Sequence, residues 1–352
     1  MTAKRRDPSV PAWDHDDIDS SSPPEIEDPY FDGDLEAWVL SRHADVLAAF
    51  QSPTLSVVGA RAGNAPDDVD EVSRLQMRAE TQEALSPSKL REWREQWLPA
   101  VQALVEKLPI DRPVDLIGEY ARPVCFPLAV LATGVGPADA ERLEKIARHV
   151  SAAAAEPFDP NLRSLAKASE AELQGCFHAG PLPLRDPGFV ALSQTLPCLM
   201  ANAWFALLRH PREWSRLHQQ SELMPQAMEE LLRYAGLTRV LFRQATAATD
   251  LNGFHIRAGE RIVLRLFPAN RDPERFPDPG RLDITRRVAN QLTLGAGPHA
   301  CVGASLIRMA AIVATQPLLE RFAGAELIGP VEWQGGAGFR SPKSLPVRLR
   351  AK

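Results

Sequence analysis

The chain has 352 residues, of which 45% are hydrophobic and 24% charged, and its formal net charge is −5 at pH 7. That length can bury a large core as one large domain or two ordinary ones, and a mildly acidic chain without a basic cluster argues against a nucleic-acid partner. No apolar run is long enough to span a bilayer and no apolar signal segment opens the chain, so the sequence predicts a cytoplasmic enzyme without a membrane partner.

Along the chain, most segments have the apolar periodicity of helices. Residues 1–28 are rich in Asp, Ser and Pro and predict a flexible arm, whereas 29–352 is expected to form a single domain. The clearest helix begins at Pro87 after Ser86, a cap residue followed by proline. Further helices are expected near 41–51, 71–85, 137–154, 187–209, 223–235 and 302–322. Strands are expected at 38–40, 239–245, 261–266 and 345–349, which gives a mainly α protein with small β-sheets.

The four cysteines indicate that one of them has a special role. Cys125, Cys176, Cys198 and Cys301 are widely spaced and form no CxxC pair. This spacing argues against a disulfide framework or a zinc site. Three of them are expected to pack as small apolar residues, the usual environment of a free cysteine.

Cys301 lies in the most informative segment, which runs from Leu294 to Gly303 and precedes a helix. A sulfur beside a helix N-terminus is favoured as a thiolate by the N–H groups and the helix dipole. Gly295 and Gly297 allow sharp turns, and Gly303 allows the helix to approach a flat ligand. An axial haem ligand needs this arrangement; the alternative is a glycine-rich turn with an incidental buried cysteine.

This segment resembles the cysteine loop of cytochromes P-450, F-G-x-G-x-H-x-C-x-G-x-x-L-A-R. The chain matches it at Gly295, Gly297, His299, Cys301, Gly303, Leu306 and Arg308. It departs at Ile307 and at Leu294, where the family has Phe beside the sulfur. The resemblance implies the cytochrome P-450 fold, with heme b held by the Cys301 thiolate between a long central helix and the helix after the loop.

The same resemblance implies partners for the two haem propionates and a structural ion pair. Arg243, His299, Arg74 and Arg78 correspond to the propionate-binding positions, and a surface charge is the alternative for Arg74. Glu230 and Arg233, three residues apart, correspond to a pair that holds an arginine of the later meander, either Arg275 or Arg281. Alone, such a pair is most often a solvated one.

The central helix departs from the family pattern. Ala191–Thr195 corresponds to the family's A-G-x-[DE]-T, so Thr195 is kept, the acid becomes Gln194 and the glycine becomes Leu192. The acid and alcohol help to deliver protons during oxygen activation, and a glutamine cannot ionise although its amide can orient water. Pro197 predicts a kink, which either recreates an oxygen-binding groove or serves packing alone.

The resemblance also suggests a substrate pocket. Thr238, Arg239, Val240, Leu192 and Phe339 are expected to line it, with Arg239 placed to hold a substrate carboxylate; Arg61 and Arg340 are weaker candidates. The region around 135–190 is shorter than in the family, and its prolines predict a shortened or loop-like roof. An open pocket would suit a large or carrier-tethered substrate.

Three functions remain open on sequence grounds. The first is a monooxygenase of secondary metabolism that oxidises a hydrophobic or carrier-bound small molecule, using Thr195 and Gln194 and electrons from a separate ferredoxin. The second is a peroxide-dependent enzyme, or an isomerase or cyclase that needs no redox partner. The third is a non-catalytic haem-binding relative, against which the intact motifs argue.

Overall fold

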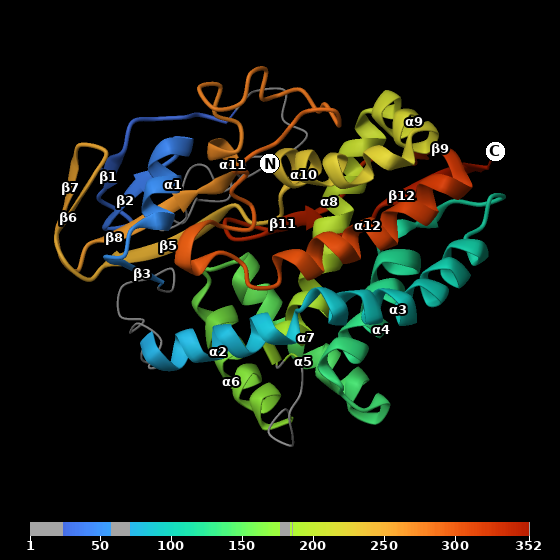
Figure 1. The fold of residues 1–352 in the computed structure, drawn as a ribbon, viewed down its shortest axis with the longest axis horizontal. Coiled ribbons are helices and arrows are strands. Elements are labelled where there is room, and N and C mark those ends of the chain that lie inside the picture. The colour runs from blue at the N-terminus through green and yellow to red at the C-terminus, as the bar shows by residue number, and fades with distance from the viewer. Residues whose placement is uncertain (1–23, 58–70, 177–183, 185, 352) are drawn as a thin grey trace, which may run out of the picture.

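The computed structural model describes residues 24–57, 71–176, 184 and 186–351. A smaller region of β-strands, formed by residues 30–57 and 240–265, lies beside a larger region of helices (Figure 1). The fold is therefore mainly α with small β-sheets, as the sequence predicts.

The largest sheet joins strands near the N-terminus to strands from residues 240–265. Its five strands have the order β1-β2-β8-β5-β3, with bounds β1 (Tyr30–Asp32), β2 (Ala37–Leu40), β8 (Arg261–Arg265), β5 (Val240–Ala245) and β3 (Leu55–Val57). Strand β2 runs parallel to β8, with Val39 opposite Val263. Successive side chains point to opposite faces, so Leu40 and Leu264 belong to one apolar cluster and Val39 and Val263 to another.

The helical region surrounds a large apolar core to which α3 contributes Trp93 and Trp97 and α8 contributes Trp204. Its helices are α2 (Glu71–Ala84), α3 (Pro87–Lys107), α4 (Arg122–Thr133), α5 (Pro137–Ala155), α6 (Pro160–Cys176), α7 (Asp186–Val190), α8 (Leu196–Arg209), α9 (Pro211–Gln219), α10 (Met224–Ala235) and α12 (Ala304–Arg321). Helix α3 begins at Pro87 as predicted, because proline fits the first turn, where its missing N–H is not needed.

Smaller elements complete the fold. Beside the sheet lie α1 (His43–Gln51), α11 (Leu266–Ala269) and the hairpin of β6 (Thr249–Leu251) and β7 (Phe254–Ile256). A three-stranded sheet has the order β4-β12-β9, and its bounds are β4 (Val114–Asp115), β12 (Pro346–Ala351) and β9 (Phe322–Leu327). A second hairpin pairs β10 (Trp333–Gly335) with β11 (Arg340–Pro342). The predicted strands correspond to β2, β5, β8 and β12.

The central helix contains a widened turn. Between α7 and α8 lies the π-helical turn η3 (Ala191–Thr195), in which the N–H of Leu196 bonds to the carbonyl of Ala191. The run Pro187–Arg209 is long and apolar enough to cross a membrane, but 78% of its most apolar window is buried inside the protein. It is therefore a core helix, and the widened turn lies where the kink was expected.

Two expectations about organisation need correction. The segment 160–176 is a helix rather than a loop, and it packs antiparallel to α5 through an Arg142–Glu172 ion pair and a His149–Ser169 hydrogen bond. The predicted arm is also not flexible throughout, because the N–H of Glu27 donates to the Ser41 hydroxyl over 2.8 Å. Residues 24–28 are thus attached to the sheet region, and 1–23 lie outside the described residues.

Candidate functional site

The loop before α12 has a tightly bonded backbone. Gly295 and Gly297 have φ values of +70° and +68°, a conformation that other residues adopt only with strain. The N–H of Cys301 donates to the carbonyl of Leu294 over 2.7 Å, which closes the loop on itself. The two glycines therefore have the turning role expected from the sequence.

The loop rests directly on α1. A Cβ atom at Gly297 would overlap the carbonyl oxygen of Phe50, so a side chain there would push the loop away. The Phe50 ring also lies under the guanidinium of Arg243, whose central carbon is 5.2 Å from the ring centroid. Phe50 thus connects the cysteine loop to β5, a contact that no sequence pattern indicated.

Cys301 is an exposed residue, although its thiol is partly covered by the surrounding chain, and the space beside the sulfur at Gly303 is open. A Cβ built on Gly303 would meet one atom within 4 Å, the Cys301 sulfur at 3.9 Å. The surface beside the sulfur therefore carries no side chain. This agrees with the close approach of a planar ligand that Gly303 was predicted to allow.

Opposing effects act on the pKa of the Cys301 thiol in the haem-free protein. Burial by the surrounding chain raises the pKa of its thiol, and this outweighs the opposing effects of the Gly303 N–H, Arg78 and Arg308. The Gly303 N–H at the start of the helix acts in the expected direction, because it lowers the pKa of the Cys301 thiol, but burial has the larger effect. A bound metal cation deprotonates a coordinating thiol outright, so ionisation can come from the ligand.

Arg243 is a buried cation next to this loop. Its side chain is 2% exposed, and its Nη1 donates to the carbonyl of Phe242 while Nε has no hydrogen-bond partner among the described residues. Burial lowers the pKa of Arg243 to about 10. A buried guanidinium with an unused donor suits an anionic group, such as a haem propionate.

The other predicted cations have different positions. Nη1 of Arg78 donates to the carbonyl of Ala300 over 2.7 Å, so this guanidinium holds the backbone next to Cys301. His299 is half-buried in the short helical turn η5 (Gly297–His299). Arg74 lies in α2, and its side chain is outside the described part of the structure. An exposed cysteine, a glycine surface and a buried Arg243 together fit heme b.

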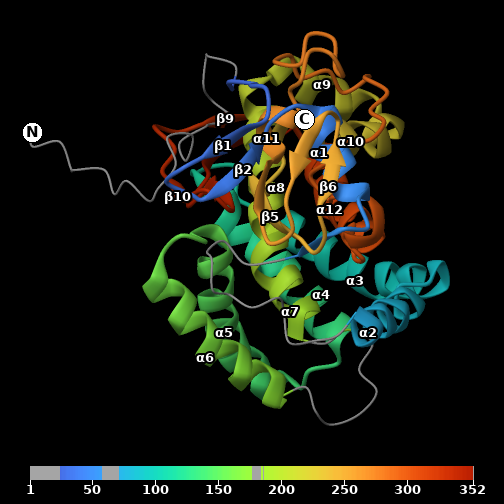
Figure 2. The same ribbon diagram turned by 90° about the vertical axis from the view of Figure 1, so that its left-hand side faces the viewer.

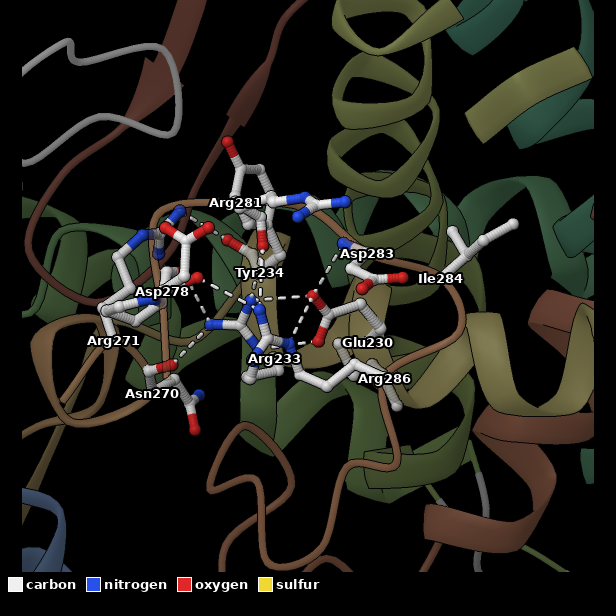
Figure 3. Close-up of polar contacts among 12 residues, drawn as sticks. Glu230, Arg233, Tyr234, Asn270, Arg271, Asp278, Arg281, Asp283, Ile284 and Arg286 are labelled. Atoms are coloured by element: carbon white, nitrogen blue, oxygen red, sulfur yellow. Dashed lines mark hydrogen bonds and ion pairs between the residues drawn. The ribbon is translucent and has the colours of Figure 1, made fainter. Parts of the chain in front are cut away.

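Glu230 and Arg233 form the predicted pair, and it is fully buried (Figure 3). Nε and Nη2 of Arg233 donate to the two carboxylate oxygens over 2.7 and 2.8 Å. Arg233 also donates to the carbonyls of Asn270, Pro279 and Arg281. The pair therefore has a folding role, since it ties α10 to the meander 270–286.

The predicted third member of this network was wrong. Arg286 bonds to Glu230 over 3.2 Å, whereas Arg281 supplies a carbonyl oxygen and Arg275 donates to the carbonyl of Ala289. No local pattern distinguishes these three meander arginines. Which of these arginines reaches Glu230 depends on the path of the meander back to α10, and the sequence does not show that path.

The predicted pocket segments meet in space. Thr238 and Phe339 form an isolated β-bridge, and the N–H of Arg239 donates to the carbonyl of Gly338 over 2.8 Å. The guanidinium of Arg239 lies 4.1 Å from the ring centroid of Phe267 and is buried, as is Val240. The guanidinium of Arg340 lies near the Trp333 ring, and Arg61 falls outside the described residues.

The altered motif of the central helix lies in η3. Leu192 and Gln194 are buried, Thr195 is half-buried, and Nε2 of Gln194 donates to the Ser193 hydroxyl over 3.3 Å. In an ordinary helix adjacent side chains point about 100° apart. The hydrogen bond between the neighbours Gln194 and Ser193 is formed where the helical turn is widened. Gln194 thus has a neutral hydroxyl as its partner.

Comparison with known proteins identifies the family. The family model "cytochrome P-450" matches residues 211–326. Nocardicin C N-oxygenase from Nocardia uniformis subsp. tsuyamanensis is 30% identical over 364 residues, which cover 89% of each protein. The chain belongs to the cytochrome P-450 family.

Other comparisons agree with this assignment. Cytochrome P-450 monooxygenase PikC of Streptomyces venezuelae is 41% identical over 165 residues, but the match covers 46% of this chain and 40% of that protein. Among solved structures, the LnmA cytochrome P-450 hydroxylase of Streptomyces atroolivaceus is 28% identical, with a TM-score of 0.75 and coverage of 88% of this chain and 90% of that one. P-450BioI with an acyl carrier protein shares the fold, with a TM-score of 0.81 at 22% identity and coverage of 89% and 92%.

Membership defines the general chemistry of this cytochrome P-450. It is an oxidoreductase of the monooxygenase class, and its cofactor is heme b with a thiolate ligand. The non-catalytic alternative left open by the sequence is therefore wrong.

Proposed function

We propose that this cytochrome P-450 oxidises a hydrophobic or carrier-bound small molecule, with Cys301 as the iron ligand. The observation that supports this most strongly is the exposed Cys301 beside Gly303, where a Cβ would meet only the sulfur. Bound haem supplies the activation of dioxygen, which a thiolate ligand promotes by donating electron density to the iron.

The residues of this chain have separate roles in holding the cofactor. Gly295 and Gly297 shape the loop. The hydrogen bond of 2.7 Å from the Cys301 N–H to the Leu294 carbonyl holds Leu294 beside Cys301. Arg243, His299, Arg74 and Arg78 are the proposed cations for the propionates. Arg243 has the strongest structural support, because it is buried and its Nε lacks a partner among the described residues. The haem would then lie between α8 and α12, with its carboxylates toward β5.

On the substrate side, Thr195 would hold a proton on its hydroxyl and Gln194 would orient water with its amide. Leu192, Thr238, Val240 and Phe339 would provide apolar contact. Arg239 would hold a carboxylate only if a ligand reaches its stacked guanidinium, which is 5% exposed.

The names of relatives support a role in secondary metabolism. They include nocardicin C N-oxygenase, luteothin monooxygenase and the polyketide biosynthesis cytochrome P-450 PksS. The P-450BioI structure contains an acyl carrier protein, which supports a carrier-bound substrate here. Electrons would come from a separate ferredoxin in the cytoplasm, because the four cysteines are scattered and supply no site for an iron–sulfur cluster.

The decisive experiment is the absorption spectrum of the purified protein, reduced and exposed to carbon monoxide. We expect the strongly red-shifted band of a thiolate-ligated haem, its loss in Cys301→Ala and its retention in Cys176→Ala, a control cysteine at the end of α6. An unshifted band in the unaltered protein would contradict the proposed ligand.

A second candidate is a peroxide-dependent enzyme, and the buried Gln194 favours it. A glutamine bonded to Ser193 cannot supply a proton as an acid does. Product formation with hydrogen peroxide but not with reduced ferredoxin would establish this second function. The reverse result would establish the ferredoxin-dependent one.

A further inference from the structure

Helix α1 supports the segment that leads into the cysteine loop. This segment, residues 290–297, is called the stem below; it begins against the first residue of α1 and ends on Phe50, close to the last one. Between these ends, Leu292 is fully buried in an apolar cluster with Val46 of α1. In Figure 2, α1 lies beside β6, which it contacts, and above α12. One helix therefore supports the stem at both of its ends.

His43, the first residue of α1, holds the beginning of the stem. Its Nε2 lies 2.8 Å from the carbonyl oxygen of Asn290. Because a carbonyl oxygen can only accept a hydrogen bond, Nε2 carries the proton and donates it. The residue is 3% exposed, and its ring packs edge-on against Phe276, with ring centroids 5.5 Å apart. Burial and an aromatic contact thus fix the direction of this donor.

The point that His43 holds is a strained one. Asn290 has a φ of +62°, a left-handed conformation that persists where the surrounding structure enforces it. The peptide groups on both sides of Asn290 are held, because Arg275 donates to the carbonyl of Ala289 over 2.8 Å and His43 to the carbonyl of Asn290 itself. The backbone N–H of His43 also donates to the buried Asp272 over 2.8 Å. His43 therefore connects α1, the meander and the stem.

The ring of His43 is a neutral donor. Burial lowers its pKa, and this outweighs the opposing effect of the Asn290 carbonyl. Arg275 and Asp272, which face the ring from the meander, act on the pKa in opposite directions. A neutral N–H at this point can therefore be supplied equally well by an amide of the right length.

The stem is connected to Cys301 by short backbone hydrogen bonds. The N–H of Gly295 donates to the carbonyl of Leu292 over 2.9 Å, and the N–H of Cys301 donates to the carbonyl of Leu294 over 2.7 Å. Two of these four residues lie at the positive-φ turn and the cysteine, and the other two belong to the stem. A shift of the stem is therefore passed on to the cysteine.

We propose that His43 is a positioning residue for the cofactor, which holds the Asn290 carbonyl and thereby keeps the Cys301 sulfur in place for the iron. The proposal rests on the proposed role of Cys301 as the ligand. Without the His43 donor, the Asn290 carbonyl is short of a partner and Asn290 is free to leave its left-handed conformation. The stem then shifts, and the thiolate is lost from the iron sooner, while the rest of the fold is unchanged.

The test compares His43→Leu, which removes the donor, with His43→Gln, whose amide N–H corresponds to Nε2. The matched control is His218→Leu, because Nδ1 of His218 lies 2.6 Å from the carbonyl of Leu319, in a contact that ties α9 to the end of α12. Each haem-loaded protein is reduced and exposed to carbon monoxide, and the red-shifted thiolate band is followed as it changes to an unshifted band. We expect His43→Leu to lose the red-shifted band about tenfold faster than the unaltered protein, as for one lost buried hydrogen bond. The other two variants should stay within about twofold.

A second measurement needs no haem. Amide exchange across residues 290–297 of the haem-free protein should be about tenfold faster in His43→Leu and unchanged in His43→Gln, because only the first variant frees the stem. If His43→Leu does not fold, His43→Asn replaces it, since its shorter amide corresponds to Nδ1 and does not reach the Asn290 carbonyl.

Three results would overturn the role of His43 and leave the proposed function standing. They are a red-shifted band in His43→Leu as lasting as in the unaltered protein, equal losses in His43→Leu and His43→Gln, and equal losses in His43→Leu and His218→Leu. The second would assign the effect to ring packing and the third to general stability. Absence of the red-shifted band from the unaltered protein would instead overturn the proposed function.

Discussion

At the scale of single residues, Arg243 shows how the site is prepared for an anion. It is a cation buried against Phe50, and burial lowers its pKa to about 10. A buried charge without a full set of partners destabilises a fold until its counter-ion arrives. The proposed pairing of Arg243 with a haem propionate would remove this cost.

Replacing Arg243 with Met should have opposite effects on the stability of the haem-free protein and on its retention of haem. We expect the free energy of unfolding of the haem-free protein to rise by about 1–3 kcal/mol, because an unpaired buried cation is replaced by an apolar side chain. The same variant should lose haem faster, measured by transfer to apomyoglobin. Arg42→Met, which removes a half-exposed guanidinium paired with Asp28, is the control and should change neither. A loss of stability in haem-free Arg243→Met would contradict this account.

The lowered pKa also predicts a pH dependence. In the haem-free fold burial lowers the pKa of Arg243 to about 10, so between this pH and the higher pKa of an ordinary guanidinium the unfolded chain binds more protons, and this contribution to stability rises with pH. Pairing with propionates needs the charged form. The contribution of Arg243 to haem affinity should therefore not change with pH below about pH 10 and should fall above it, a pH dependence that Arg243→Met should abolish in the same transfer assay.

The sequence predicted part of this site at the level of residues. The turns at Gly295 and Gly297 and the Glu230–Arg233 pair could be predicted, because the resemblance to the family supplied both motifs, whereas the ligand role of Cys301 stays a prediction. Phe50 and Arg286 could not, since each acts through a contact with a residue distant in the chain. A local sequence pattern predicts which residues carry a suitable chemical group. Tertiary contacts determine which of several similar residues, such as the meander arginines, reaches a given partner.

At the scale of elements, the Glu230–Arg233 pair joins α10 to the meander. Arg233→Ala should lower the free energy of unfolding by about 3–5 kcal/mol, because it leaves a buried carboxylate and three carbonyls short of donors. Arg286→Ala should lower the free energy of unfolding less, because the Arg286 side chain is 15% exposed. Urea unfolding followed by circular dichroism measures both, and equal losses would contradict the ranking.

The widened turn η3 gives a second prediction for an element. Pro197 cannot donate to the carbonyl of Ser193, and Pro197→Ala would supply that donor. If the proline imposes the wide turn, the variant should show roughly tenfold slower amide exchange across 193–198, as ordinary helical bonding returns. Unchanged exchange would mean that packing against α4 and α5 imposes it.

Helix α6 shows why one element was missed. Its buried side chains are mostly small, Ala166 and Ser169 besides Leu173, so they leave little apolar periodicity. These small side chains are enough to bury one face of α6, because α5 packs against them. Pro160, taken as a sign of a loop, instead begins α6, as Pro137 begins the predicted α5.

At the scale of the whole molecule, residues 24–28 act as an attached segment. Glu27 bonds to Ser41, and the buried Arg265 donates toward the carbonyl of Glu25. A chain that begins at Pro29 should be less stable than one that begins at Pro24 by about 1–2 kcal/mol, since these hydrogen bonds are lost. Thermal unfolding of the two truncated proteins measures the difference, and identical midpoints would contradict it.

The pairing of N-terminal strands with β5 and β8 in the large sheet also determines when the haem site can form during synthesis. Strand β2 needs β8, which lies more than two hundred residues later, and the cysteine loop needs Phe50 beneath Gly297. On the ribosome, the first strands must therefore wait until nearly the whole chain has emerged. Haem capture is accordingly expected after release, and the segment 211–326 that matches the family model is not expected to fold alone.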